Sequence, residues 1–162
     1  MKRFMCTLLC FWFAFTANSQ KNFHFSDSTF TLGQKHILTD VRYALGGYNQ
    51  LLVTDSLMLS QLDSVVQFLE KNNTITVEIG VHTDHRGSDT SNARITQFRA
   101  ESVRNYLIAR GIPSLRITAK GYGESQLVVP SEEIEKYRKT DKKTYEALHQ
   151  RNRRTELKIT GI

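Results

Sequence analysis

The sequence predicts an α+β fold in which a small mixed sheet of about four strands carries two main helices on one face. In several short segments apolar residues alternate with polar ones, which is typical of strands with one buried face. Between these segments apolar residues recur every three or four positions, which is typical of helices that pack on a sheet. The chain has 162 residues, enough for one domain with a single core.

The predicted strands cover residues 36–43, 74–81, 115–120 and 154–160. The second is the clearest, because its alternation gives one apolar face, formed by Ile75, Val77, Ile79 and Val81. In the third strand we expect three side chains to face the core: Leu115, Ile117 and Ala119. In the last strand we expect Leu157 and Ile159 to face the core, and the polar side chains to face water: Arg154, Glu156 and Lys158.

The first predicted helix begins at Asp55 or Ser56 and ends near Lys71. Its buried stripe consists of Met58, Leu62, Val65 and Leu69. Because strand–helix–strand connections form right-handed parallel crossovers, we expect the helices to lie on the same face of the sheet.

The second predicted helix follows a turn at Gly87 and extends towards Gly111, with Asp89 or Ser91 as its capping residue. Its i, i+4 stripe consists of Ile95, Arg99, Val103 and Leu107. Arg99 thus interrupts an apolar stripe. A guanidinium there needs an acceptor, either a protein carboxylate or the anionic part of a ligand.

The segment 126–150 is long and charged and contains Pro130. We predict an enlarged loop there, with helical pieces at residues 131–136 and 142–150. The rest of the chain shows no repeat and no low-complexity tract.

The N-terminus predicts a secretory signal peptide at residues 1–19, and therefore export to the periplasm or the outer membrane. A basic start precedes an apolar run at residues 4–15, which is too short to span a bilayer. Small residues before Gln20 favour cleavage there. Lipid attachment at Cys10 is the alternative, but the bulky Leu9 disfavours it.

Residues 20–33 form a lead-in whose aromatic side chains either dock on the domain or contact a partner, and residues 34–162 form the domain itself. Both cysteines fall in the leader, so the remainder has no disulfide. Without the leader, 20 basic and 16 acidic residues leave a net charge of +4. These charges are interspersed, which favours a solvated surface over a nucleic-acid interface.

Four motifs and a helix carry a resemblance to a known family. H-T-D-x-x-G-S at residues 82–88 is followed by Asn92 and by R-A in the next helix. Downstream lie R-G-I-P-x-x-R-I, G-Y-G-E-S and N-R-R-T-E, at residues 110–117, 121–125 and 152–156. With the helical segment 60–69, this order resembles the OmpA C-terminal-like family over residues 34–160. The family includes outer-membrane proteins, peptidoglycan-associated lipoproteins and flagellar stator subunits.

The resemblance implies non-covalent binding of the peptidoglycan stem peptide through diaminopimelate, whose side chain ends in an ammonium and a carboxylate. Asp84 would accept the ammonium, and Arg99 would hold the carboxylate through its planar fork. Amides around Thr83 and Asp84 would donate to the same carboxylate. Asn92 would shape the pocket. Arg153, rather than Arg154, would border the pocket and either pair with Asp84 or reach the peptide.

Other functions find less support in the residues. Asp84 and Arg99 could form a simple ion pair that fixes the loop on the helix. His82 and His85 flank Asp84, but we find no further ligands and expect no metal and no cofactor. No nucleophile elbow or catalytic carboxylate pair is present, so an enzyme is not expected. A protein-interaction subunit of an envelope assembly, using the lead-in and the enlarged loop, is the remaining alternative.

Overall fold

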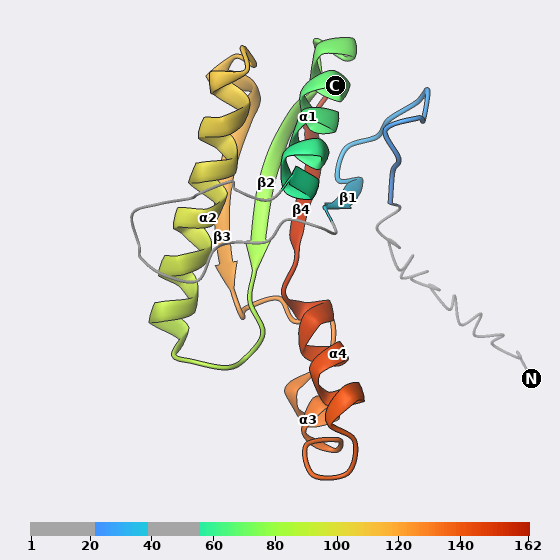
Figure 1. Ribbon diagram of the computed structural model, residues 1–162. Helices are drawn as coiled ribbons and strands as arrows, with labels where there is room; N and C mark the ends of the chain where they lie inside the picture. Colours follow the sequence, from blue (N-terminus) through green and yellow to red (C-terminus); the bar gives the residue numbers. More distant parts are fainter. Residues whose placement is uncertain (1–21, 39–55) are drawn as a thin grey trace, which may run out of the picture.

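The computed structural model describes residues 22–38 and 56–162 and contains a four-stranded sheet (Figure 1). The strands are β1 (Lys35–Leu38), β2 (Thr76–His82), β3 (Ile117–Gly123) and β4 (Thr155–Gly161), in the order β1-β4-β2-β3. β2 and β3 are parallel, whereas β4 runs antiparallel to both β1 and β2. The predicted α+β fold with a mixed sheet is therefore confirmed.

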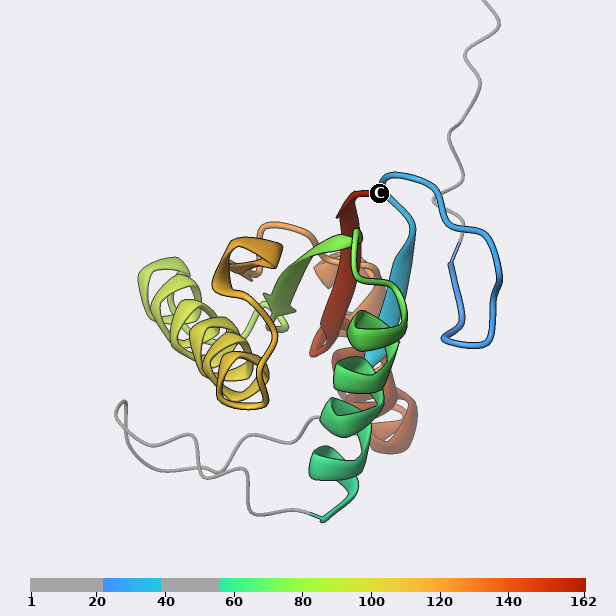
Figure 2. The same ribbon diagram turned by 90° about the horizontal axis from the view of Figure 1, so that it is seen from above.

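Two helices, α1 (Ser56–Lys71) and α2 (Asp89–Ala109), cover one face of this sheet (Figure 2). The predicted bounds of the first helix and its buried stripe are confirmed, since Met58, Leu62, Val65 and Leu69 are all fully buried. In the middle of the sheet, Leu157 on β4 lies between His36 on β1 and Ile79 on β2. Burial of an aliphatic side chain such as Leu157 or Ile79 contributes about 1.5–3 kcal/mol to stability.

The contact between α2 and β3 depends on a glycine in the G-Y-G-E-S motif. A Cβ atom added to Gly121 would lie 2.2 Å from the backbone nitrogen of Gln97, which no real structure tolerates. The amide of Gly121 donates to the side chain of Gln97 at 2.8 Å. The amide of Gly123 donates to the hydroxyl of Thr96 at 3.0 Å. The helix is thereby held close to the strand.

Three predicted side-chain positions are wrong, those of Leu115, Glu156 and Arg154; the last was expected in water, but its side chain is only 9 % exposed. Leu115 does not face the core but is 93 % exposed, because residues Ser114–Arg116 form a 3-10 turn and the strand begins at Ile117. The side chain of Arg116 donates to carbonyls before β2 and thereby stabilises this turn. Glu156 does not face water but is 6 % exposed. It pairs with Lys35 at 2.8 Å and with Arg154 at 2.7 Å.

The lead-in docks on the domain, as predicted. Phe23 is fully buried, and its ring centroid lies 5.3 Å from that of Phe68 on α1. Phe25 and Phe30 contact the same ring. The predicted leader at residues 1–19 and most of the predicted strand 36–43 lie outside the described residues.

The predicted helical pieces of the enlarged loop are α3 (Ser131–Glu135) and α4 (Lys142–Asn152). They lie beyond the end of the sheet at which β2 and β3 end and β4 begins (Figure 1). We call residues 126–150, the enlarged loop with its two helices, the insertion. Asn152 is fully buried and fixes the start of the insertion, because its Oδ1 accepts from the amides of Val128 and Val129 at 2.8 and 2.9 Å. Its Nδ2 donates to the carbonyl of Val129 at 2.9 Å. Among the described residues, no helix is both long and apolar enough to cross a membrane.

Candidate functional site

The loop that follows β2 is fixed at both ends. The amide of Thr83 donates to the carbonyl of Gly123 at 2.9 Å, which ties the loop to the end of β3. At the other end Ser88, not Asp89 or Ser91 as predicted, caps α2. Its extended backbone allows its hydroxyl to accept from the amide of Ser91 at 3.3 Å. Gly87, directly before Ser88, has φ +111° and so supplies the left-handed backbone conformation at the end of the loop.

Asp84 occupies the centre of this loop and is only 4 % exposed. Its Oδ1 accepts from the amide of Arg86 at 3.0 Å, a local turn between residues two apart. Its Oδ2 accepts from the guanidinium of Arg86 at 2.8 Å and also from that of Arg153. The carboxylate is therefore held between two arginines from different parts of the chain.

This environment keeps Asp84 charged. Burial raises its pKa, but the hydrogen bonds from Arg86 and Arg153 act in the opposite direction and lower the pKa to about 2. The guanidinium of Arg86 also donates to Glu146 on α4 at 2.9 Å. The insertion thus reaches Asp84 through Arg86 as well as through Arg153, the residue directly after α4.

Asn92 determines the shape of the loop. It is 7 % exposed, and its Nδ2 donates to the carbonyl of Arg86 at 3.2 Å and to that of Asp84 at 3.5 Å. The same amide nitrogen donates to the carboxylate of Glu124, after β3. Asn92 therefore holds the loop on the first turn of α2.

Thr83 is buried, and its amide is already bonded to Gly123, so this amide is not available to a ligand carboxylate. Any backbone donors must come from the amides that follow in the loop. The hydroxyl of Thr83 is also buried, and it has no hydrogen-bond partner in the described part of the chain.

Arg99 is half-buried and lies at the edge of the α2 face that packs on the sheet. The buried residues of that face are Asn92, Thr96, Ala100, Val103 and Leu107. The predicted stripe with Arg99 in its centre was wrong, because each i, i+4 step turns by about 40° around the helix and three such steps turn by about 120°. Within residues 22–38 and 56–162, the ion pairs of arginine with Asp84 come from Arg86 and Arg153, so a direct Asp84–Arg99 pair is not found.

Residues 59–141, about half of the chain, match the sequence profile of the OmpA family. The chain belongs to the OmpA family. Related sequences include outer membrane protein A of Shimwellia blattae, 44 % identical over 73 residues, and that of Serratia odorifera, 36 % identical over 104 residues. These alignments cover 45 % and 64 % of the chain but only 30 % and 42 % of the relatives, so the chain matches less than half of either protein.

Solved structures share the OmpA-like fold. The peptidoglycan-associated lipoprotein of Burkholderia pseudomallei superposes with a TM-score of 0.53 at 24 % identity, over 65 % of this chain and 80 % of that one. A MotB-like protein of Desulfovibrio vulgaris superposes with a TM-score of 0.52 at 20 % identity, over 67 % and 64 % of the two chains.

The two histidines that flank the loop residues Thr83 and Asp84 have different surroundings. His82 is 2 % exposed, stacks on Tyr122 with ring centroids 4.8 Å apart, and has its Nε2 3.6 Å from Glu156. Burial lowers its pKa. His85 points instead towards Glu135, with 3.3 Å between Nε2 and Oε1. The two histidines therefore do not form one ligand set with Asp84.

Several residues around Asp84 were not found from the sequence. Arg86 had a usable signal, because an aspartate two residues before it can accept from its amide in a local turn. Glu135, Glu146 and His149 had none, since they lie 50 or more positions away in an insertion whose placement depends on tertiary packing. The expectation that His85 has no further ligands nearby was wrong for the same reason.

A shallow cavity of about 400 Å³ lies on the other side of Arg153. Its lining combines apolar and basic side chains: Ile37, Leu38, Val128, Gln150, Arg151, Arg153 and Arg154. Arg154 turns towards this side, where it donates to Glu156, whereas Arg153 turns towards Asp84. Arg153 thus lies between Asp84 and this cavity.

Proposed function

We propose that this OmpA-family chain binds diaminopimelate-containing peptidoglycan non-covalently and thereby anchors or organises the envelope of a Gram-negative bacterium. The observation that carries the proposal is Asp84, a buried carboxylate that stays ionised on a loop fixed by Thr83 and Asn92. A charge with few contacts to water is costly unless it is paired. Such a group is suited to recognise an ammonium.

The ligand would bind by exchange. Arg86 and Arg153 supply the positive charge beside Asp84. The side chain of Arg86 is 43 % exposed, so it can move outwards while the ammonium of diaminopimelate takes its place. The exchange keeps the local charge constant. The carboxylate of the ligand would then be bound by Arg99 and by the loop amides after Thr83.

The names of fold relatives agree with this proposal. One is a peptidoglycan-associated lipoprotein, and another, with a TM-score of 0.50 at 22 % identity, is the cell wall anchor of the type VI secretion system of Pseudomonas aeruginosa. On this proposal the chain is exported, its leader is residues 1–19, and it acts by binding rather than by catalysis.

The alternative is a protein-interaction subunit of an envelope assembly that does not bind the wall. The insertion favours it, because Glu146 and Arg153 contribute to the surroundings of Asp84 and much of α3 and α4 is exposed and charged. In that case a partner would contact the insertion, and Asp84 would only hold the loop.

Sedimentation with purified sacculi tests the proposal. We expect Asp84→Asn and Arg99→Ala each to reduce the bound fraction at least tenfold. The matched controls are Asp89→Asn and Arg94→Ala, which change exposed residues on α2, the helix that carries Arg99. Both control variants should bind as the unchanged chain does. Equal binding by all four variants would refute the mechanism.

A titration with meso-diaminopimelate, followed by NMR, separates the two halves of the site. Lysine is the control, because it has the side-chain ammonium but lacks the second carboxylate. Selective shifts for diaminopimelate at Asp84 and Arg99 support the proposal. No binding to diaminopimelate or to sacculi would favour the protein-interaction alternative.

A further inference from the structure

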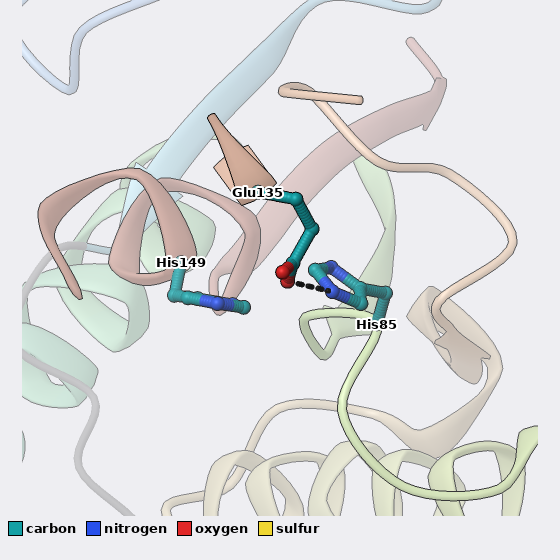
Figure 3. Close-up of side chains that lie close together, drawn as sticks. All are labelled: His85, Glu135 and His149. Carbon is teal, nitrogen blue, oxygen red and sulfur yellow. Dashed lines mark hydrogen bonds and ion pairs between the residues drawn. The ribbon is translucent and has the colours of Figure 1, made fainter. Parts of the chain in front are cut away.

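Three side chains with metal-binding atoms meet beyond the end of the sheet. His85 comes from the loop after β2, Glu135 from the end of α3 and His149 from α4. One ligand atom from each lies within 4.8 Å of the others. The carboxylate of Glu135 lies between the two imidazole rings, and all three side chains point towards one another (Figure 3).

The ring of His149 packs against those of Tyr145 and His85, with centroids 4.5 and 4.9 Å apart, but this packing does not satisfy its two nitrogens. It is fully buried, and neither of its ring nitrogens has a hydrogen-bond partner among the described residues. The Nδ1 of His85 is likewise buried without a partner there. Buried polar atoms are almost always bonded, so two unbonded nitrogens require an explanation. His82 has the same deficit, but of these two histidines only His149 lies in a group of three metal-binding side chains among the described residues. The Nδ1 of His149 lies 3.4 Å from the Oδ2 of Asp84, but this contact does not have the geometry of a hydrogen bond.

We propose that His85, Glu135 and His149 bind a divalent transition-metal ion of the zinc class. Two imidazoles and one carboxylate form a donor set that suits zinc and leaves a fourth position open for water. Ligand atoms about 2.0–2.1 Å from a tetrahedral ion lie about 3.3 Å apart. The Nε2 of His85 and the Oε1 of Glu135 already have this spacing, at 3.3 Å.

The remaining adjustment is small and falls on side chains that can move. Spacings of up to 4.8 Å must shorten by about 1.5 Å to reach the spacing of a tetrahedral site. The side chains of His85 and Glu135 are 20 % and 38 % exposed, so both can shift towards the buried His149. Asp84 lies 3.4 Å from the Nδ1 of His149 and, once the ring turns into hydrogen-bond geometry, would supply the carboxylate that commonly orients a metal-binding imidazole.

Nearby positive charges do not prevent binding, because each has an anionic partner. Arg86 is bonded to both Asp84 and Glu146. Arg138 approaches the other carboxylate oxygen of Glu135 at 3.5 Å, but its side chain is 68 % exposed. A bound ion would join both helices of the insertion to the loop that carries Asp84, and so fix their relative positions.

The test is isothermal titration of the purified metal-free chain with Zn²⁺, together with NMR of its five histidines. We expect one ion per chain and shifts at His85 and His149, but not at His24 or His36. Glu135→Gln and His85→Asn should each weaken binding at least tenfold, because each removes one of the three proposed ligands from a partly exposed position.

Two controls keep the result specific. Glu133→Gln changes an exposed carboxylate on the same short helix, and His24→Asn changes a histidine of the lead-in; both should leave the affinity unchanged. Binding that survives in the Glu135→Gln, His85→Asn double variant would overturn the proposal. Shifts confined to His24 and His36 would also overturn it. Neither measurement depends on peptidoglycan binding, so the two proposals can fail separately.

Discussion

The replacement Asp84→Asn tests how much the buried carboxylate contributes to stability. Asparagine keeps the shape of the side chain but removes the charge that Arg86 and Arg153 share. The pKa of Asp84 falls from 3.8 to about 2, because the arginine bonds outweigh the burial that would raise it. At about 1.4 kcal/mol per pH unit, this difference corresponds to about 2 kcal/mol of folding free energy.

The sign of the effect fixes its pH range. A carboxylate whose pKa is lowered in the folded chain stabilises it fully above its unfolded pKa, here 3.8. This contribution is lost as the pH falls through about 2, the pKa of Asp84 in the folded chain, below which the protonated carboxyl is uncharged like asparagine. In urea unfolding at pH 7, the variant should lose about 2 kcal/mol, which moves the midpoint by about 1–2 M. At pH 2.5 the two chains should differ by much less.

The control is Asp89→Asn, which removes an exposed carboxylate from the first turn of α2 and should cost about 0.3–1 kcal/mol. All measurements include a chelator, so that metal does not contribute. A loss for Asp84→Asn that is the same at pH 7 and pH 2.5 would refute the reasoning, because it would mean that the charge of Asp84 is not what stabilises the loop.

Three further changes test other contacts. Asn152→Ala leaves the amides of Val128 and Val129 without their acceptor, so thermal unfolding should show a loss of about 2–4 kcal/mol and proteolysis should cut the insertion first. Phe23→Ala removes a fully buried ring and should destabilise the chain by about 3–5 kcal/mol in urea. Glu146→Gln releases Arg86 from α4, and on the exchange proposed above it should increase binding to sacculi severalfold. A decrease would show instead that Glu146 orders the site.

The insertion gives this OmpA-family chain its particular site. Arg153, at the end of α4, and Glu146, within it, act on the carboxylate or on its arginine partner. His149 and Glu135 extend this region towards His85. Wall binding through Asp84 and metal binding through His85 would therefore act on adjacent residues of one loop, and the insertion would couple them.

Local patterns predicted most of the secondary structure. The apolar stripe of α1 and the alternation of β2 lie on buried faces, as expected, because each depends only on the period of its own element. The same reasoning failed at Leu115, which alternates in the sequence with Ile117 as a core-facing strand residue would but lies in a 3-10 turn. It also failed at Arg99, because the angular drift of a helix over three turns is not visible in i, i+4 spacing alone.

The sequence by itself determined the α+β fold, the order of its elements, and the motif residues Asp84 and Asn92, which local periodicity and short motifs encode directly. Among the groups around Asp84, the family resemblance pointed to Arg153, and only the tertiary structure added Arg86, Glu146 and His149. Glu156 was expected in water but is buried between Lys35 and Arg154, and Arg153 and His149 reach Asp84 from across the fold. Charge pairing between distant residues depends on how the insertion packs against the end of the sheet. No pattern within a single element contains that information.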